Sequence, residues 1–480
     1  MPIYRMQVRD LVHGIIRFTD VEQQVVDHPL FQRLRNVRQA DLAYYVYPSS
    51  HISRFEHMLG ACHVAGLMAE NLTESRLWRR YLGELKAATG ISSKEQFVQV
   101  ARLYALFHDI GHMPFSHLFE RAMEIYAEQQ RIEFEDMVRD WFGDTTFDKP
   151  HEALGSIMIR RIVADIGLGE PLRTGVLRLM TEKEPPPFDP LWPLKLLVDS
   201  QIDADRIDFV ARDGLLAGGE YGTHDIARIT SAVFLEHTPD NEWCVAYSEK
   251  ALGSLEALLY DRYRTYVWIN FHHRGIAVKL LARFLMSVLL ERGIITNADF
   301  LNVDTETLAL RDDVWLTTLI RELDPAGDER VVLAKRALLL REKRHTFNLW
   351  RNRPIYEDLY GQLQRRAQIT ISGDEYKDRF PEERYGEHLA RELGLTAFVY
   401  HTGFRPVEKD EIPLYDERQR RATGRTLRDV SELVQSLQAI WEREPQFYVV
   451  LLGDRSERTD HEIRAAWLDS SVRWLRSERR

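Results

Sequence analysis

Residues 97–107, with the sequence FVQVARLYALF, give the strongest structural signal in this chain. Their apolar side chains recur at spacings of three and four residues, which is the period of one face of an α-helix. The pattern ends at His108 and Asp109, so an imidazole and a carboxylate follow each other at the end of a predicted helix. Helical patterning dominates residues 29–290, including His57–Leu72 and Leu252–Leu290, and the second of these is expected to form two helices interrupted near Gly275. The chain is therefore expected to be mainly α-helical.

Two segments interrupt this helical patterning, a polar stretch at Gly83–Ser93 and the proline-rich Glu182–Pro193. Beyond about Asp299 short β-like runs appear, namely AQITIS (Ala367–Ser372), TAFVYH (Thr396–His401) and QFYVVLL (Gln446–Leu452). A further helix is predicted at Thr426–Trp441. The sequence thus predicts a helical core at residues 1–298 and a smaller α+β extension at residues 299–480. We expect the extension to pack on the core and not to be a separate catalytic module.

The overall charge and the cysteine content narrow the class of protein. A formal net charge of −10 argues against a protein-wide field that attracts nucleic acid, so nucleic acid is not an expected partner. The two cysteines, Cys62 and Cys244, lie in no CxxC motif, so neither a disulfide framework nor a thiolate metal site is indicated. The start of the chain does not resemble a signal peptide, and the apolar run near Leu280–Leu290 contains Arg283 and is too short for a membrane span. A cytoplasmic protein that makes no membrane contact is expected.

Histidines are concentrated directly after the helix at residues 97–107. The stretch HDIGHMPFSH contains His108, His112 and His117 within ten residues, and Gly111 and Pro114 predict a sharp turn between them. A lone His-Asp pair is common by chance and often belongs to a surface or to a capped helix end. The density of imidazoles between apolar flanks instead favours a half-buried site.

Carboxylates are concentrated further along the chain, in DSQIDADRIDFVARD. Four aspartates within eleven residues are too many for an ordinary buried helix, unless a cation turns their repulsion into ligation. We expect one divalent ion to be held by His57, His108, Asp109 and Asp205. Imidazole nitrogen and carboxylate oxygen suit Mn, Fe, Zn, Ni or Mg to differing degrees.

The order of motifs resembles that of the HD-domain deoxynucleoside-triphosphate triphosphohydrolases, the family of bacterial dGTPases and the vertebrate SAM-and-HD-domain dNTPase. The motifs are DLVHGIIRF, HPLFQRLRNVRQ, SRFEHMLG, HDIGHMPFSHLFE, HEALGS and IDADRIDFVARD, followed more weakly by EYGTHD and LYDRYRTYVWINFHHR. The resemblance implies an HD-domain helical core and a metal-dependent enzyme. Its reaction would convert a deoxynucleoside triphosphate to the deoxynucleoside and inorganic triphosphate.

Carried over by position, the resemblance also implies a catalytic set. It assigns His57, His108, Asp109 and Asp205 to the metal, in agreement with the pattern above. His112, His117 and His151 would surround the reacting phosphate. His117 is the expected proton donor to the leaving oxygen, and Glu120, one helical turn later, would orient it. A second ion, Mg²⁺ brought by the nucleotide, fits the same chemistry.

The same carry-over implies the contacts to the substrate. Arg54 and Arg206 would bind the phosphates, Asp213 would reach the sugar 3′-hydroxyl, and Gln39 would lie near the same sugar. Phe209 departs from the family, since relatives of the vertebrate type have a tyrosine there that contacts the sugar. The nucleotide preference is therefore left open.

Assembly and regulation are implied by the resemblance alone. Its members often form oligomers that bind an activating nucleotide between subunits, so a homo-oligomer (dimer, tetramer or hexamer) is expected. The segment Asp27–Arg35 resembles the part that holds a guanine nucleotide, with Asp27, Gln32 and Arg35 as candidate contacts. An ordinary capped amphipathic helix with Arg33 and Arg35 in solvent explains the pattern equally well.

Three functions therefore stay open on the sequence alone. The first is hydrolysis of deoxynucleoside triphosphates, in pool housekeeping or in nucleotide depletion during phage infection. The second is another HD-type phosphodiesterase, such as a nuclease or a signalling-nucleotide hydrolase. The third is a nucleotide sensor with little turnover. The acidic balance and the lack of an added nucleic-acid module favour the first over a nuclease, and the full set of histidines favours an enzyme over a sensor.

Overall fold

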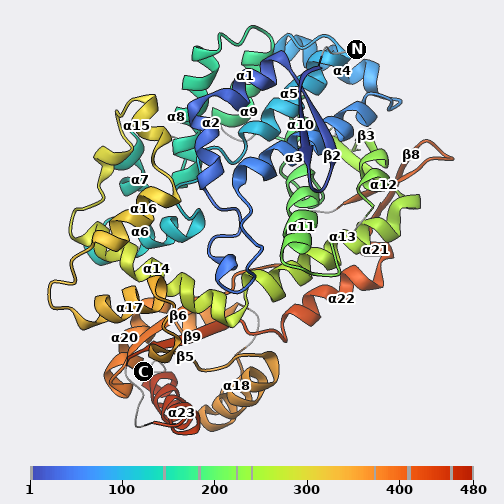
Figure 1. Ribbon diagram of the computed structural model, residues 1–480. Helices are drawn as coiled ribbons and strands as arrows, with labels where there is room; N and C mark the ends of the chain where they lie inside the picture. The colour runs from blue at the N-terminus through green and yellow to red at the C-terminus, as the bar shows by residue number, and fades with distance from the viewer. Residues whose placement is uncertain are drawn as a thin grey trace.

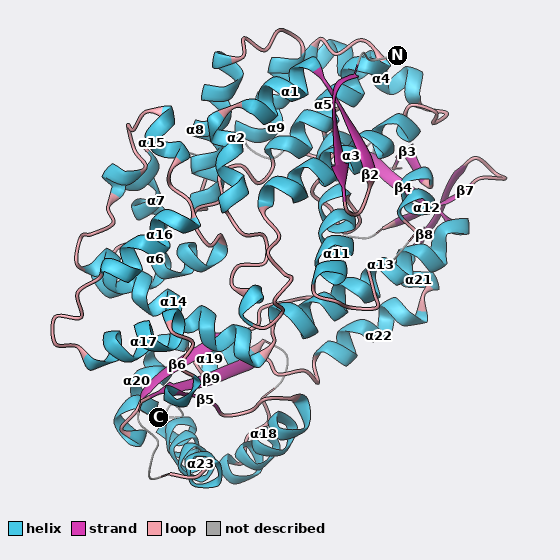
Figure 2. Ribbon diagram, viewed as in Figure 1, coloured by secondary structure: helices cyan, strands magenta, loops and turns pink. Residues whose placement is uncertain are grey.

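The chain begins with a β-hairpin, which the helical patterning did not predict. In the computed structural model β1 (Tyr4–Asp10) pairs antiparallel with β2 (Gly14–Thr19), and Asp10 lies opposite Gly14 at the turn. The structure describes residues 4–143, 147–181, 185–222, 225–238, 242–371, 374–407, 412–453 and 458–477. Helices make up most of these residues, as Figure 2 shows, so the protein is mainly α with small sheets.

Two long helices lie at the centre of the first part of the chain. The predicted helix at residues 97–107 is α5 (Lys94–Phe107), and the one predicted at His57–Leu72 is α3 (Arg54–Leu72). Both are buried along most of their length. The helices around them are α1 (Asp20–Asp27), α2 (Pro29–Gln32), α4 (Trp78–Thr89), α6 (His117–Gln130), α7 (Phe134–Phe142), α8 (Pro150–Asp165), α9 (Leu172–Thr181), α10 (Trp192–Leu196), α11 (Ala204–Leu216), α12 (Ile226–Ser231), α13 (Leu252–Thr265) and α14 (His273–Glu291).

The predicted break at Gly83–Ser93 is wrong over most of its length. The helix α4 continues to Thr89, and Gly90 ends it with a positive φ of 82°. Tyr81 and Leu85 are fully buried on one side of α4, so the helix is stabilised by packing although its other faces are polar. The helical stretch predicted at Leu252–Leu290 is divided by a π-helical turn at Tyr266–Asn270.

The last third of the chain surrounds a three-stranded antiparallel sheet with the order β5 (Thr346–Asn348), β9 (Phe447–Leu452), β6 (Thr396–His401). Two of the predicted strands are β6 and β9. The third is wrong, because Ala367 ends α18 and residues 368–371 form no strand; Ser372 lies outside the described residues. The predicted helix at Thr426–Trp441 is divided at Ser431. The helices here are α15 (Thr305–Ala309), α16 (Asp313–Glu322), α17 (Glu329–Leu339), α18 (Arg353–Ala367), α19 (Glu375–Arg379), α20 (Glu382–Leu393), α21 (Leu427–Val430), α22 (Glu432–Trp441) and α23 (Asp460–Ser477).

Strands from both parts of the chain share a second sheet. Its order is β3 (Val233–His237), β4 (Trp243–Ser248), β7 (Pro413–Asp416), β8 (Arg421–Thr426), and β4 pairs in parallel with β7. In Figure 1, α14 separates the helical part from the three-stranded sheet, and it contacts helices and strands on both sides. Residues 299–480 thus pack against the first part through a shared sheet and through α14, whereas the boundary at residue 298 stays a prediction.

Short 3₁₀ turns complete the description, at Arg33–Asn36, Ala43–Tyr45, Glu249–Ala251, Asn297–Asp299 and Lys343–His345. Among the described helices, none has both the length and the apolar composition that crossing a bilayer requires.

Candidate metal centre and active site

Four side chains, from the helices α3 and α11 and from the turn that follows α5, converge beside the end of α5. One nitrogen or oxygen atom each of His57, His108, Asp109 and Asp205 lies within 4.8 Å of the other three. Asp205 Oδ1 is 2.9 Å from Nε2 of His57 and 3.6 Å from Nε2 of His108. Nε2 of His108 is also 3.6 Å from Asp109 Oδ2. The structure therefore brings together the four residues that the sequence proposed as metal ligands.

The nitrogens that face this centre contact only its carboxylates. Nε2 of His57 and Nε2 of His108 are buried, lie near Asp205, and have no hydrogen-bond partner outside the centre among the described residues. Each ring uses Nδ1 instead, His57 towards Asp208 Oδ2 at 2.8 Å and His108 towards the carbonyl oxygen of Ala105 at 2.8 Å. A ring that donates from Nδ1 has a lone pair on Nε2 for a metal. Two such imidazoles beside two carboxylates can hold a divalent ion.

The pKa values of the residues in the centre also favour a bound cation. Burial lowers the pKa of His57, but hydrogen bonds and charges from Asp205 and Asp208 outweigh it and raise that pKa to about 10. Burial raises the pKa of Asp109, but the charges of Arg54 and His108 hold it well below its ordinary value. The carboxylates are therefore ionised and demand a positive charge, which a proton on His57 or a metal ion can supply.

Arg54 lies inside the site and contacts Asp109. Its Nη1 pairs with Asp109 Oδ2, its Nε donates to Ser116 Oγ at 2.9 Å, and the residue is only 3% exposed. The predicted phosphate ligand thus positions a carboxylate in this structure. Arg206, the other predicted phosphate ligand, donates to Asp203 at 2.6 Å.

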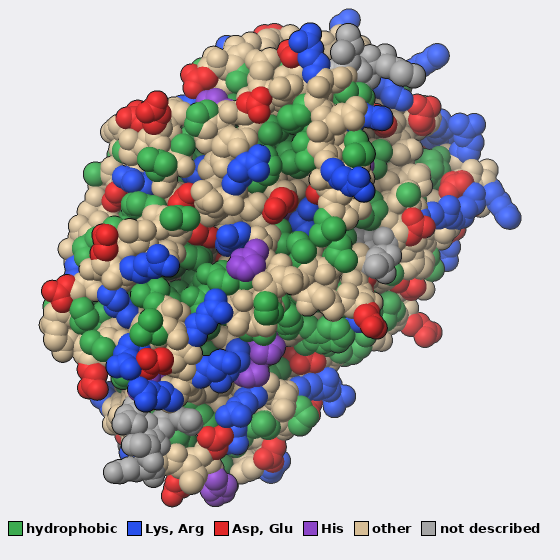
Figure 3. Space-filling view, in the orientation of Figure 1, with side chains coloured by type: hydrophobic (Ala, Val, Ile, Leu, Met, Phe, Trp, Pro, Cys, Tyr) green, Lys and Arg blue, Asp and Glu red, His purple; other side chains and the backbone are tan. Residues whose placement is uncertain are grey.

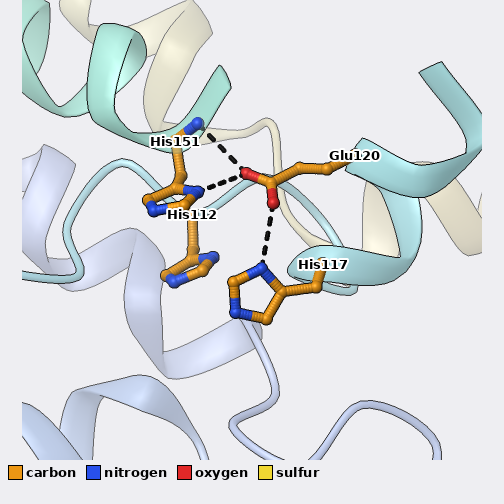
Figure 4. Close-up of side chains that lie close together, drawn as sticks. All are labelled: His112, His117, Glu120 and His151. Carbon is orange, nitrogen blue, oxygen red and sulfur yellow. Dashed lines mark hydrogen bonds and ion pairs between the residues drawn. The ribbon is translucent and has the colours of Figure 1, made fainter. Parts of the chain in front are cut away.

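A second cluster adjoins the first and consists of His112, His117, Glu120 and His151 (Figure 4). Glu120 accepts hydrogen bonds from Nδ1 of His151 at 2.6 Å and from the backbone N–H of His151 at 3.1 Å on Oε1. Its Oε2 lies 2.9 Å from Nδ1 of His117. The rings of His112 and His151 stack with centroids 4.6 Å apart. Nε2 of His112 lies 3.2 Å from Asp109 Oδ1, which joins the two clusters.

The histidines of this second cluster differ in exposure and in pKa. Burial and the charge of Arg54 keep the pKa of His112 well below its ordinary value, so this ring is neutral. The side chain of His117 is 67% exposed. Its surroundings lower the pKa of His117 by desolvation, but the hydrogen bond and charge of Glu120 prevail and raise it. An accessible imidazole that a carboxylate keeps protonated to higher pH is suited to general-acid catalysis.

Close packing of backbones explains Gly111 in the HDIGH motif. A Cβ atom on Gly111 would lie 2.0 Å from the carbonyl oxygen of His151 and 2.3 Å from the backbone nitrogen of Gly155. The loop after Asp109 can therefore rest directly on α8, which brings His151 beside His112. Phe115 and Ser116, at φ angles of 55° and 53°, continue this loop in a conformation that side chains disfavour.

Arg33 and Asp313 hold this loop, and the sequence did not assign either of them to the site. Arg33 was expected in solvent if Asp27–Arg35 is an ordinary helix, but it is 3% exposed and donates to the carbonyl oxygens of Ile110 and His112 at 2.8 and 2.7 Å. Asp313 of α16 accepts the backbone N–H of Phe115 at 2.7 Å. No local motif marks either residue, because both act across long sequence separations.

The candidate sugar contacts are buried and incompletely paired. Oδ1 of Asp213 and Oε1 of Gln39 are buried and have no hydrogen-bond partner among the described residues. Burial raises the pKa of Asp213 to about 7. Unpaired buried polar atoms of this kind carry a free-energy cost that a bound ligand can relieve.

The candidate activator contacts lie at the surface. Asp27 and Arg35 are exposed, and Gln32 is partly buried. Nε2 of Gln32 donates to the carbonyl oxygen of Val26 at 2.6 Å, and Nε of Arg35 donates to Oε1 of Gln32 at 2.7 Å. The guanidinium of Arg35 also lies 3.6 Å from the ring centre of Phe55.

Basic side chains gather on one face of the molecule, although the net charge is negative. Figure 3 shows them over the region of α14 and α17. A hollow of about 200 Å³ in this region is lined by Tyr45, Arg274, Arg341 and Lys343, among others. Local positive charge of this kind attracts anions in spite of the acidic balance of the whole chain.

Part of the chain around the centre matches a known domain family. The HD domain family model matches residues 54–172, which include His57, the His108-Asp109 pair and the second cluster. A crystal structure of a hypothetical protein from Aquifex aeolicus matches 96% of this chain and 99% of its own, with a TM-score of 0.61 and 19% identity, which shows a common fold.

Sequence relatives match over more limited regions. An uncharacterized protein of Methanocaldococcus jannaschii is 26% identical over 315 residues, covering 65% of this chain and 54% of the relative. The Dictyostelium discoideum protein named deoxynucleoside triphosphate triphosphohydrolase SAMHD1 homolog is 25% identical, covering 57% of this chain and 47% of the relative. Human SAMHD1, which has the same enzyme name, is 27% identical, and the match covers 54% of this chain and 40% of human SAMHD1. The chain spans about half the length of the curated relatives it matches.

Proposed function

We propose that this chain, whose residues 54–172 match the HD domain family model, is a phosphohydrolase that converts deoxynucleoside triphosphates to deoxynucleosides and inorganic triphosphate. The observation that carries the proposal is the contact between the two clusters. A centre able to hold a metal ion lies against a histidine–carboxylate cluster able to donate a proton, through the 3.2 Å contact between Asp109 and His112. Hydrolysis of a phosphate ester uses both functions.

The metal would be held by His57, His108, Asp109 and Asp205. A divalent ion supplies Lewis-acid polarisation of a phosphate oxygen and lowers the pKa of water. Arg54 keeps Asp109 ionised and in place, and the Nδ1 contacts of His57 and His108 direct their Nε2 atoms to the centre. The candidate ions are Mn, Fe, Zn, Ni and Mg, and the nucleotide would bring a second Mg²⁺. Metal analysis of the purified protein, with and without nucleotide, identifies the ions that are bound.

His117 would supply the proton for the leaving group. Water would add to the α-phosphorus and release a proton to solvent as the bond to the 5′ oxygen breaks, and Nε2–H of His117 would protonate that oxygen and later regain its proton from solvent. Glu120 holds Nδ1 of His117 at 2.9 Å, which leaves Nε2 as the donor, and the exposed ring is open to a substrate. His112 and His151 form the stacked wall beside it.

We assign the substrate contacts on the same basis. The unpaired oxygens of Asp213 and Gln39 would bind the sugar. Arg54 and Arg206 would face the phosphates, and the basic face over α14 and α17 would attract the polyphosphate. Asp27, Gln32 and Arg35 would contact an activating nucleotide in a homo-oligomer.

One assay with product identification tests the proposal. The purified protein with Mn²⁺ or Mg²⁺ is offered each deoxynucleoside triphosphate, alone and in mixtures, and in parallel single-stranded DNA and cyclic dinucleotides. Equal amounts of deoxynucleoside and triphosphate would support the proposed bond cleavage. Release of pyrophosphate or of single phosphate would exclude it, and turnover of DNA or cyclic dinucleotides alone would favour a phosphodiesterase. Binding without turnover of any substrate would indicate a nucleotide sensor.

A further inference from the structure

Asp208 is a fully buried carboxylate, and each of its two oxygens has two hydrogen-bond partners. Oδ2 lies 2.8 Å from Nδ1 of His57 and accepts from Nε of Arg212 at 2.9 Å. Oδ1 lies 2.6 Å from Nε2 of His13 and accepts from Nη2 of Arg212 at 2.8 Å. Burial raises the pKa of Asp208, but the charge of Arg212 and the hydrogen bonds prevail and keep it well below its ordinary value. Such a carboxylate has a fixed orientation, because any rotation would break several of these contacts.

This carboxylate ties the N-terminal hairpin to the candidate metal ligand His57. His13 lies in the turn between β1 and β2, and Asp10 at the end of β1 accepts from Nη1 of Arg212 at 2.9 Å. Asp10 also accepts the backbone N–H groups of Val12 and His13 at 2.8 and 2.9 Å, which fixes the turn. The side chains of His13 and Asp208 are 3% and 0% exposed. A buried network of hydrogen bonds and ion pairs therefore runs from the hairpin to the ring of His57.

The absence of a side chain at Gly60 allows Asp208 and Arg212 to pack against α3. Gly60 lies on α3, three residues after His57, where a Cβ atom would come within 1.9 Å of Asp208 Oδ1 and within 2.5 Å of Nη2 of Arg212. Any side chain at this position would push Asp208 and Arg212 away from α3. The glycine of the RFEHMLG motif is thus explained by the approach of the Asp208–Arg212 pair and not by a need of the helix itself, since glycine weakens a helix.

We propose that Asp208, His13 and Gly60 position His57 for the metal, so that the N-terminal hairpin sets the affinity of the centre for its ion. The inference rests on the proposed metal site and adds residues that act on it without being ligands. Asp208 fixes the proton of His57 on Nδ1 and the lone pair on Nε2, and His13 and Arg212 fix Asp208. Partners of this kind typically change metal affinity 10–100-fold when they are removed.

Alanine substitutions at two glycines of the same helix provide a matched test. Gly66, six residues after Gly60 on α3, packs against Arg102, and a Cβ there would meet Nη1 of Arg102 at 2.8 Å. Arg102 is itself held in a buried ion pair with Glu22 at 2.6 Å. Gly60→Ala and Gly66→Ala therefore each force an alanine against a buried arginine ion pair, but only the first touches the network of His57.

The measurement is the dissociation constant for Mn²⁺, by titration calorimetry of full-length protein freed of metal. Far-ultraviolet circular dichroism and the unfolding temperature of each metal-free variant report whether it is folded. We expect Gly60→Ala, Asp208→Asn and His13→Gln to weaken Mn²⁺ binding roughly 10–100-fold. We expect Gly66→Ala to bind within about threefold of the wild type, a difference of roughly 0.6 kcal/mol.

The outcomes separate this inference from the proposed metal site. A wild-type protein that binds no divalent ion would overturn the metal site and this inference together. Tight binding by the wild type and equally tight binding by folded Gly60→Ala and His13→Gln would overturn the positioning role alone. If Asp208→Asn does not fold, His13→Gln decides the question, because it removes one of the four contacts and leaves the ion pair with Arg212. Equal weakening by Gly60→Ala and Gly66→Ala would show a general effect of α3 and would also overturn it.

Discussion

Asp313 Oδ1 accepts the backbone N–H of Phe115 at 2.7 Å, although the two residues are 198 positions apart in the chain. Oδ2 of the same carboxylate accepts the backbone N–H of Arg38 at 3.0 Å. Phe115 and Ser116 have positive φ angles, and Ser116 accepts from Arg54, which holds Asp109. The helix α16 thereby stabilises the strained loop between the two clusters.

Replacement of Asp313 by alanine should damage the active site from a distance. The buried backbone N–H of Phe115 and the partly buried one of Arg38 would lose their acceptor, so we expect the free energy of unfolding to fall by about 2 kcal/mol. We also expect turnover to fall at least tenfold in protein that is still folded, because the loop carrying His112 and Ser116 loosens. Denaturant unfolding and steady-state kinetics below the unfolding temperature measure the two effects. Asp304→Ala, which removes the N-cap of α15, is the control and should leave turnover unchanged.

Removal of a candidate metal ligand should abolish both metal content and turnover. Asp205→Ala and His57→Ala each take one donor from the centre and leave the second cluster intact. We expect metal content, measured by mass spectrometry of elements, to drop well below one ion per chain. Chelation of the wild type should give the same inactive state and should be reversed by added Mn²⁺. Full activity in a metal-free variant would contradict the assignment.

His117→Ala should separate chemistry from metal binding. The ring lies outside the four-residue centre, so we expect an unchanged metal content. The rate should fall roughly 10²–10⁴-fold if His117 is the general acid. A substrate with a better leaving group than the 5′ oxygen needs less protonation and should lose less rate. An equal loss with both substrates would argue against a proton-donor role.

The dependence of the rate on pH should reveal the contact between Glu120 and His117. The general acid must be protonated, so the rate falls as the pH rises through the pKa of His117. Glu120 raises this pKa above its ordinary value, and the alkaline decline should therefore lie above pH 6.5. Glu120→Gln removes the charge and should shift the decline to lower pH, with little change in metal content. An alkaline limb that does not move in this variant would assign the decline to another group.

Activation by a second nucleotide should depend on the surface residues of α1 and η1 (Arg33–Asn36). If Asp27 and Arg35 contact an activator, the rate with a single deoxynucleoside triphosphate should rise when a guanine nucleotide is added. The double variant Asp27→Ala, Arg35→Ala should lose this rise and keep the basal rate. Light scattering with and without the nucleotide measures whether subunits assemble. A rise that persists in the double variant would leave Asp27–Arg35 as an ordinary surface segment.

The local pattern of the sequence was sufficient for the main helices and for the concentrations of imidazoles and carboxylates at the centre, whereas His151 and Glu120 were assigned only through the family resemblance. The period of apolar residues in α5 and α3 reports which face is buried, and this face is decided within a few turns. Imidazoles and carboxylates in His108–His117 and Asp199–Asp213 are costly to bury without a partner, so their density was itself informative. All the short strands except β6 and β9 were missed, namely β1, β2, β3, β4, β5, β7 and β8, since their pairing gives little local signal.

What only the tertiary structure decided is which side chain serves which partner. The sequence marked Asp208 as one of several carboxylates, but only the fold directs it to Nδ1 of His57, with His13 on its other side. The sequence pattern is compatible with Arg33 as a surface residue, whereas in the structure Arg33 donates to the carbonyl oxygens of Ile110 and His112. These contacts join residues that are distant in the chain, and their strength comes from burial. The sequence determines the chemistry of each side chain, whereas the packing of helices that meet only in the folded protein determines its partner.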